Sequence, residues 1–190
     1  MILSLSTSSP VASVALFDGS ARVLAEKSAE APRNASEKLP ELIQAVMGMV
    51  SADLDDVKGV VADLGPGSFT GVRVGVTFAK VLAYRRELVC GGIDSFDLID
   101  SGPVAVPNRR EQYFLREPGQ DVRYIDASEL GDLPGYGPHY AANTYPNAAR
   151  AAEVQNRIRW GEPATLVPNY IAQPKISQPK RSYGLEAPRG

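Results

Sequence analysis

The stretch LGPGSFTGVRVGVTFAK, residues 64–80, decides the fold class of this chain. An apolar segment at residues 57–64 precedes it and predicts a buried strand. After the glycine-rich turn, small residues recur at every fourth position from Gly71 to Ala83. Residues four apart lie on one face of a helix, so this helix has a nearly flat face. The order strand, glycine turn, helix is typical of α/β folds.

The glycine turn matches neither standard phosphate-binding motif. A P-loop requires a lysine directly after its last glycine, whereas Gly71 is followed by Val72. A Rossmann fingerprint requires two residues between its second and third glycines, but three separate Gly67 from Gly71. Interior glycines cost a helix about 1 kcal/mol each relative to alanine, so a compensating close contact is expected. We expect another helix, from another chain, to provide it.

A second interpretation of residues 69–84 is a strand, because valines alternate with other residues between Val72 and Phe78. The length of the segment and its small-residue face favour the helix. Ser68 is a suitable N-cap, and the cations near Arg86 suit the carboxyl end of a helix.

Composition excludes several classes of protein. The chain has 190 residues, 44% hydrophobic and 22% charged, which is ordinary for a globular protein. Its net charge of -2 argues against broad nucleic-acid binding by this chain alone. Cys90 and His139 are the single cysteine and histidine, which excludes an intrachain disulfide and ordinary zinc sites. Residues 1–17 lack a basic region and contain five serines, so we expect neither a signal peptide nor a membrane span there. We therefore expect the protein to be cytoplasmic.

The rest of the chain divides into two predicted lobes and a tail. Strands are predicted at residues 2–5, 11–17, 21–28, 57–64, 88–93, 104–106, 112–116 and 122–126, and helices at residues 36–50, 69–84 and 148–159. The break Ser-Gly-Pro at residues 101–103 marks a boundary. We expect Trp160 to close the last helix against the core. The predicted domains are residues 1–101, residues 102–168 and a proline-rich basic tail, residues 169–190.

No catalytic or metal-binding constellation is recognisable. The lone cysteine and histidine are far apart in the sequence and neither lies in a nucleophile elbow. The aspartates follow no spacing motif. Arg109 and Arg110 are interpreted as a solvated hairpin tip, with an anion grip as the alternative. We therefore predict no catalytic residue, no metal and no cofactor.

Several runs resemble the TsaB family, also called YeaZ. They are GPGSFTGVRVGVTFAKVLA at residues 65–83, ILSLSTSSPVASVAL at 2–16, RNASEKLPELI at 33–43, NRREQYF at 108–114 and VPNYI at 167–171. The resemblance implies an α/β, actin-like ATPase (ASKHA) fold with two ribonuclease-H-like lobes and mixed sheets, the second lobe reduced. It also implies a place in the machinery that puts threonylcarbamoyl on the adenosine after the anticodon of tRNA.

In that family this subunit is a non-catalytic scaffold. Its implied partners are a TsaD-like catalytic subunit and a TsaE-like ATPase, a second copy when it is alone, and tRNA only through the complex, with no membrane. TsaD binds metal through paired histidines, whereas the equivalent region here is Asn34-Ala35-Ser36.

The resemblance implies pairing through the helices at residues 36–50 and 69–84. The expected interface residues are Leu42, Val46, Met49, Phe69, Gly71, Val72, Gly75, Val76 and Ala79. On this hypothesis, replacing Gly75 with leucine abolishes pairing and leaves a folded monomer.

One departure from the family concerns nucleotide binding. The family usually has aspartate where this chain has Ser6, which removes a carboxylate that could act toward a magnesium-bound nucleotide. A vestigial nucleotide or phosphate turn is still possible at Thr7, Ser8, Gly65, Gly67 and Ser68. The alternative function is therefore a nucleotide-binding enzyme of the actin or sugar-kinase superfamily. A third, a peptidase, lacks any suitable set of residues.

Overall fold

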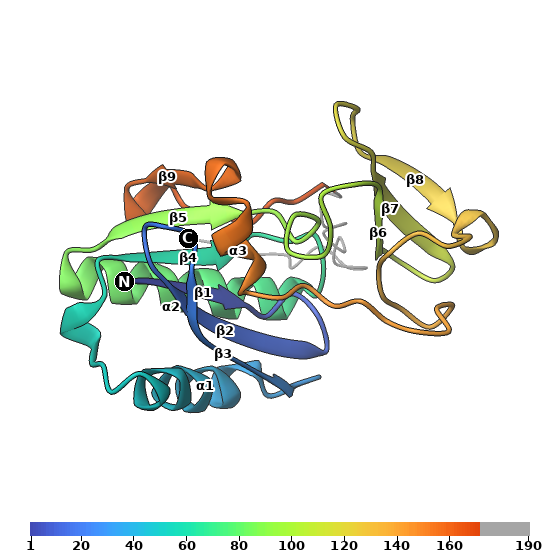
Figure 1. Ribbon diagram of the computed structural model, residues 1–190. Helices are drawn as coiled ribbons and strands as arrows, with labels where there is room; N and C mark the ends of the chain where they lie inside the picture. The colour runs from blue at the N-terminus through green and yellow to red at the C-terminus, as the bar shows by residue number, and fades with distance from the viewer. Residues whose placement is uncertain (172–190) are drawn as a thin grey trace, which may run out of the picture.

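The computed structural model describes residues 1–171, which form two β-sheets of different size (Figure 1). From residue 172 on, the predicted basic tail lies outside the described residues. Within residues 1–171, no helix combines the length and the apolarity that crossing a membrane requires.

The larger sheet is mixed and has the strand order β3-β2-β1-β4-β5-β9. Strands β1, β2 and β3 pair antiparallel, β4 and β5 continue parallel to β1, and β9 returns antiparallel to β5. Its strands are β1 (Ile2–Ser6), β2 (Val11–Phe17), β3 (Val23–Glu30), β4 (Gly59–Asp63), β5 (Val89–Ile93) and β9 (Arg159–Gly161). The mixed α/β class predicted from the sequence is confirmed.

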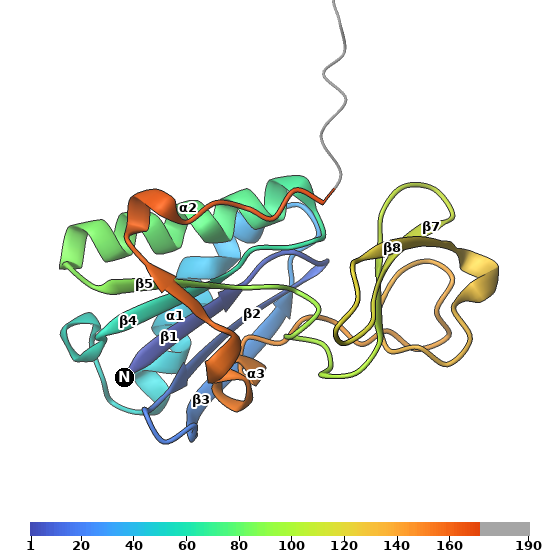
Figure 2. The same cartoon turned by 90° about the horizontal axis from the view of Figure 1, so that it is seen from above.

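Two long helices, α1 (Ala35–Met49) and α2 (Phe69–Arg86), cover one face of this sheet (Figures 1 and 2). The apolar positions of α1 recur three and four residues apart and face the sheet. Helix α2 begins at Ser68, whose Oγ accepts a hydrogen bond from the Gly71 N–H at 3.2 Å. The helix interpretation of this segment is confirmed, and the strand interpretation is wrong.

The segment from residue 148 to residue 158 packs on the other face of the large sheet, and residues 159–161 pair at its edge. The single helix predicted at residues 148–159 is wrong, because the segment contains α3 (Arg150–Glu153), a 3-10 helix (Gln155–Arg157) and then β9. Pairing with β5 satisfies the backbone of residues 159–161 at the sheet edge. Trp160 lies in this edge strand and is 43% exposed, so it does not close a helix against the core.

The smaller sheet is the antiparallel meander predicted for the second part of the chain. Its strands are β6 (Val104–Pro107), β7 (Gln112–Arg116) and β8 (Arg123–Asp126). The remaining short helices are all 3-10: Leu54–Asp56, Ala127–Glu129 and Pro163–Thr165. Residues 148–161, predicted to belong to the second lobe, pack on the large sheet instead.

Candidate functional site

The small-residue face of α2 packs on the turn between β1 and β2. A β-carbon at Gly71 would overlap the carbonyl oxygen of Thr7, and one at Gly75 would lie 2.5 Å from Thr7 Oγ1. Thr7 Oγ1 also donates a hydrogen bond to the Gly71 carbonyl oxygen at 2.8 Å. The close contact predicted for these glycines is therefore made within the chain, which corrects the expectation that another chain provides it.

Most of the apolar residues expected at a partner interface are also internal. Only two of them are substantially exposed, Met49 at 63% and Phe69 at 48%. The others pack in the chain's own core: Leu42, Val46, Val72, Val76 and Ala79. An apolar stripe at helical spacing predicts that one face of the helix is covered, but it does not predict which surface covers it. In this protein the large sheet covers that face.

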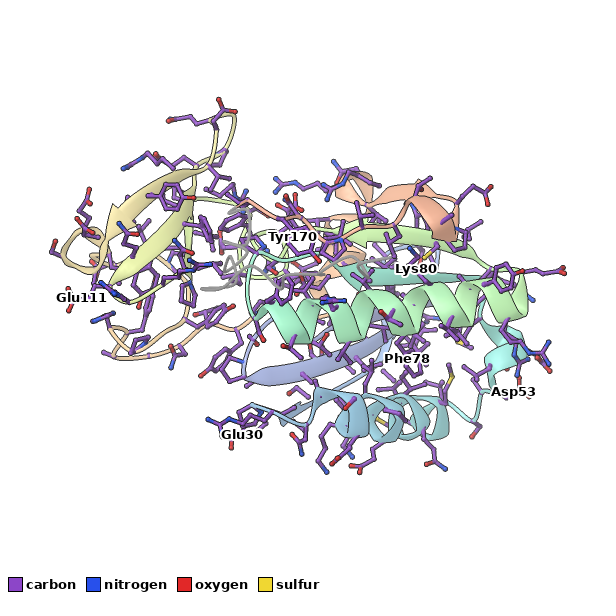
Figure 3. All side chains as sticks on the ribbon, turned by 180° about the vertical axis from the view of Figure 1, so that it is seen from behind. Glu30, Asp53, Phe78, Lys80, Glu111 and Tyr170 are labelled. Carbon is purple, nitrogen blue, oxygen red and sulfur yellow. The ribbon has the colours of Figure 1, made fainter. Side chains whose placement is uncertain are left out.

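The outward face of α2 carries a different apolar group. Val81 is 63% exposed and Tyr84 is 84% exposed. Val74 and Phe78 are half-buried, and Figure 3 shows Phe78 on the edge of α2 that faces α1. None of these four residues was among the predicted interface residues. Val81 and Tyr84 point away from the core, whereas Val74 and Phe78 pack against its edge. The most exposed large apolar side chains of the two helices are therefore Val81, Tyr84 and Met49.

A buried carboxylate connects three segments at the carboxyl ends of β1, β4 and β5. Asp63 Oδ2 accepts hydrogen bonds from Ser6 Oγ at 2.6 Å and Ser8 Oγ at 2.5 Å. Asp63 Oδ1 accepts from Ser95 Oγ at 2.5 Å and from the Gly65 N–H at 2.8 Å. Sequence reasoning missed this cluster; its signal was an aspartate ending an apolar strand.

Burial raises the pKa of the Asp63 carboxyl, while hydrogen bonds from the three serines and Gly65 oppose that rise. Within the described residues, Asp63 forms no ion pair. Tyr136, from the loop after the small sheet, donates its hydroxyl to the Ser8 carbonyl oxygen at 3.2 Å. Burial, and secondly the Asp63 charge, raise the pKa of Tyr136. The cluster therefore also contacts the second sheet's part of the chain.

The two turns proposed for a nucleotide or phosphate, at Thr7 and Ser8 and at Gly65, Gly67 and Ser68, lie together. They bind each other, because the Ser68 N–H donates to the Ser8 carbonyl oxygen at 2.6 Å. A β-carbon at Gly67 would overlap Ser8. The hydroxyls of Thr7 and Ser8 already donate inside the protein. These groups are therefore occupied by the chain itself rather than directed at an outside anion.

Within residues 1–171, the single cysteine and the single histidine do not form a nucleophile–base pair. The Cys90 thiol is buried, and burial raises its pKa. His139 Nδ1 lies 3.0 Å from the Tyr113 hydroxyl, in the small-sheet part of the chain. In residues 1–171, no three His, Cys, Asp or Glu side chains gather in a way that could hold a metal ion.

Comparison with known proteins agrees with the fold. A family model described as TsaD: tRNA N6-adenosine threonylcarbamoyltransferase matches residues 24–105. The solved structure of YeaZ from Pseudomonas aeruginosa superposes with a TM-score of 0.69 at 19% identity, covering 90% of this chain and 99% of that one.

Two curated relatives are named tRNA threonylcarbamoyladenosine biosynthesis protein TsaB. The Escherichia coli protein is 31% identical over 102 residues, and the Bacillus subtilis protein is 30% identical over 98 residues. These matches cover 53% and 52% of this chain but only 43% and 42% of the relatives, so the chain matches less than half of their length.

The protein is thus of the α/β class with the actin-like ATPase-type fold. Within that class, the chain is similar to proteins named TsaB and YeaZ.

Proposed function

We propose that this chain takes part in the biosynthesis of threonylcarbamoyladenosine in tRNA as a non-catalytic scaffold subunit. It pairs through α1 and α2 with a TsaD-like catalytic subunit, and with a second copy of itself when that subunit is absent. A TsaE-like ATPase joins the assembly, and tRNA is reached through the complex. The names of the E. coli and B. subtilis relatives support the pathway.

The observation that carries the pairing is the exposed apolar surface on the two helices. Val81 and Tyr84 on α2 and Met49 on α1 are each more than 60% exposed. Helices α1 and α2 contact each other, and an ion pair between Arg86 and Asp55 joins the end of α2 to the residues that follow α1. Large apolar side chains left exposed on two helices in contact are typical of an interaction surface.

The internal bonding of the Ser8 and Ser68 turns supports a non-catalytic role. A nucleotide-binding enzyme would need free donors at these turns, whereas the Ser68 N–H and the Ser8 hydroxyl are engaged within the chain. This alternative therefore receives no support from the geometry of the site.

Pairing is tested by co-expressing the chain with the TsaD-like subunit of the same genome and measuring affinity by titration calorimetry. We expect Val81→Asp to weaken pairing about a hundredfold or more, because a charge would be buried without a partner. The control is Tyr124→Asp, since Tyr124 is 52% exposed and lies in β8 of the small sheet, outside both helices. Equal affinity of the two variants would contradict the proposed interface, provided both keep the wild-type circular dichroism.

A further inference from the structure

A groove of about 650 Å³ lies between the start of α2 and the small-sheet part of the chain. Its walls are mainly apolar and include Pro10, Pro66, Pro107, Phe114 and Tyr136. The function proposed above does not use this groove, because the pairing surface lies on the outward faces of α1 and α2.

Two aromatic rings stand at the rim of the groove. The rings of Phe69 and Tyr170 lie 5.6 Å apart between centroids, and each residue remains about half exposed. The guanidinium of Arg73 lies 5.3 Å from the centroid of the Phe69 ring. Figure 3 shows Tyr170 beside the first half of α2, on the side toward the sheet edge. The pair therefore presents aromatic surface beside a cation.

The groove has one charged side chain among its described lining residues, and it is a cation. That side chain is Arg109, and none of the described lining residues is acidic. Two amides, Asn108 and Asn169, line it as well. Asn169 Nδ2 donates to Asp94 at 3.1 Å, and Asp94 is itself paired with Arg159. The groove thus combines aromatic faces, amide groups and arginine with no carboxylate among its lining residues.

We propose that this groove binds an unpaired base of single-stranded RNA. The base stacks on Phe69 and Tyr170, and the neighbouring phosphates lie toward Arg73 and Arg109. Stacking on aromatic side chains, with arginine at the backbone, is how proteins hold unpaired bases. An apolar peptide would use the walls but not the two arginines. The proposal rests on the proposed role in tRNA modification, since it gives that role a direct RNA contact.

The proposed site uses only two arginines to contact phosphates. This small number is compatible with a chain whose net charge is -2. Two contacts predict that the logarithm of the binding constant falls with the logarithm of salt concentration at a slope of about -1.4, using the single-strand factor of about 0.7 per phosphate. A protein that depends on a broad basic surface would show a much steeper slope.

The test measures fluorescence anisotropy of a labelled oligoadenylate with the full chain at low salt. We expect saturable binding, with Phe69→Ala and Tyr170→Ala each weakening it about tenfold, as one lost stacking contact predicts. Phe69→Trp keeps an aromatic face and should bind like the wild type. The control is Trp160→Ala, because Trp160 is a partly exposed aromatic residue in β9 that does not line the groove.

The proposal is overturned by no saturable binding of the wild type, by an equal loss in Trp160→Ala and Phe69→Ala, or by equal binding of an RNA duplex. Adenosine monophosphate binding as tightly as the oligonucleotide would assign the groove to a free nucleotide and overturn it too. Val81→Asp separates the two proposals, since it should lose partner pairing and keep RNA binding. Tyr170→Ala should keep partner pairing and lose RNA binding.

Discussion

Gly75→Leu is expected to unfold the protein rather than to release a folded monomer. The new side chain would begin 2.5 Å from Thr7 Oγ1, between α2 and the β1–β2 turn. Gly71→Leu should be at least as damaging, because its β-carbon would overlap the Thr7 carbonyl oxygen. Relieving such overlap requires moving a helix away from its sheet, so we expect the free energy of unfolding to fall by about 3 kcal/mol or more. Urea unfolding followed by circular dichroism measures this.

The control for this experiment is a glycine with open surroundings in the other long helix. Gly48 lies in α1, is exposed, and a β-carbon there meets no atom within 4 Å. Gly48→Ala should therefore raise the free energy of unfolding by about 0.5–1 kcal/mol, since alanine restricts the unfolded chain and favours the helix. If Gly75→Leu kept wild-type stability and lost only pairing, the contact with Thr7 would not be the reason for the glycine.

Asp63→Ala is the second substitution expected to have a large effect. It leaves the hydroxyls of Ser6, Ser8 and Ser95 and the Gly65 N–H without their shared acceptor. Each buried donor without an acceptor costs about 1–3 kcal/mol, although Ser95 and Ser8 can still bond to each other. We expect a loss of about 3 kcal/mol or more in the free energy of unfolding. Wild-type stability of this variant would show that the cluster does not hold the turns.

Asp63→Asn tests the charge of the same group through its pH dependence. The pKa of Asp63 is raised in the folded protein from a value of 3.8, with burial as the main cause. The folded state therefore binds the proton more tightly than the unfolded state, so this contribution to stability is full below pH 3.8 and is lost as the pH rises through the folded pKa. Relative to the wild type, Asp63→Asn should gain stability as the pH rises. A difference that does not change with pH would contradict a raised pKa.

Much of the fold could be predicted from local patterns. The opening strands of the large sheet, both long helices and the three strands of the small sheet follow from spacing and turn residues, as the helix from Phe69 to Arg86 illustrates. The segment from residue 148 to residue 161 could not be predicted, because Arg159–Gly161 is a strand only through its pairing with β5. A three-residue strand has no periodicity of its own to detect.

The candidate site could be predicted less well than the fold. The aspartate cluster joins Ser6, Asp63 and Ser95, which are far apart in the sequence and meet only because parallel strands end at the same edge of a sheet. The pair of Phe69 and Tyr170 depends in the same way on how residues 163–171 cross α2. No spacing rule connects such residues.

The sequence by itself determined that one face of α2 is small and must lie against something at close range. It determined this because glycine and alanine at every fourth position share one face of a helix whatever surrounds them. Only the tertiary structure decided that Thr7 of the same chain fills that space, and that Val81 and Tyr84 are the large apolar residues of this helix left most exposed. The physical reason is that periodicity reports which residues share a face, whereas the contact on that face depends on segments distant in the sequence.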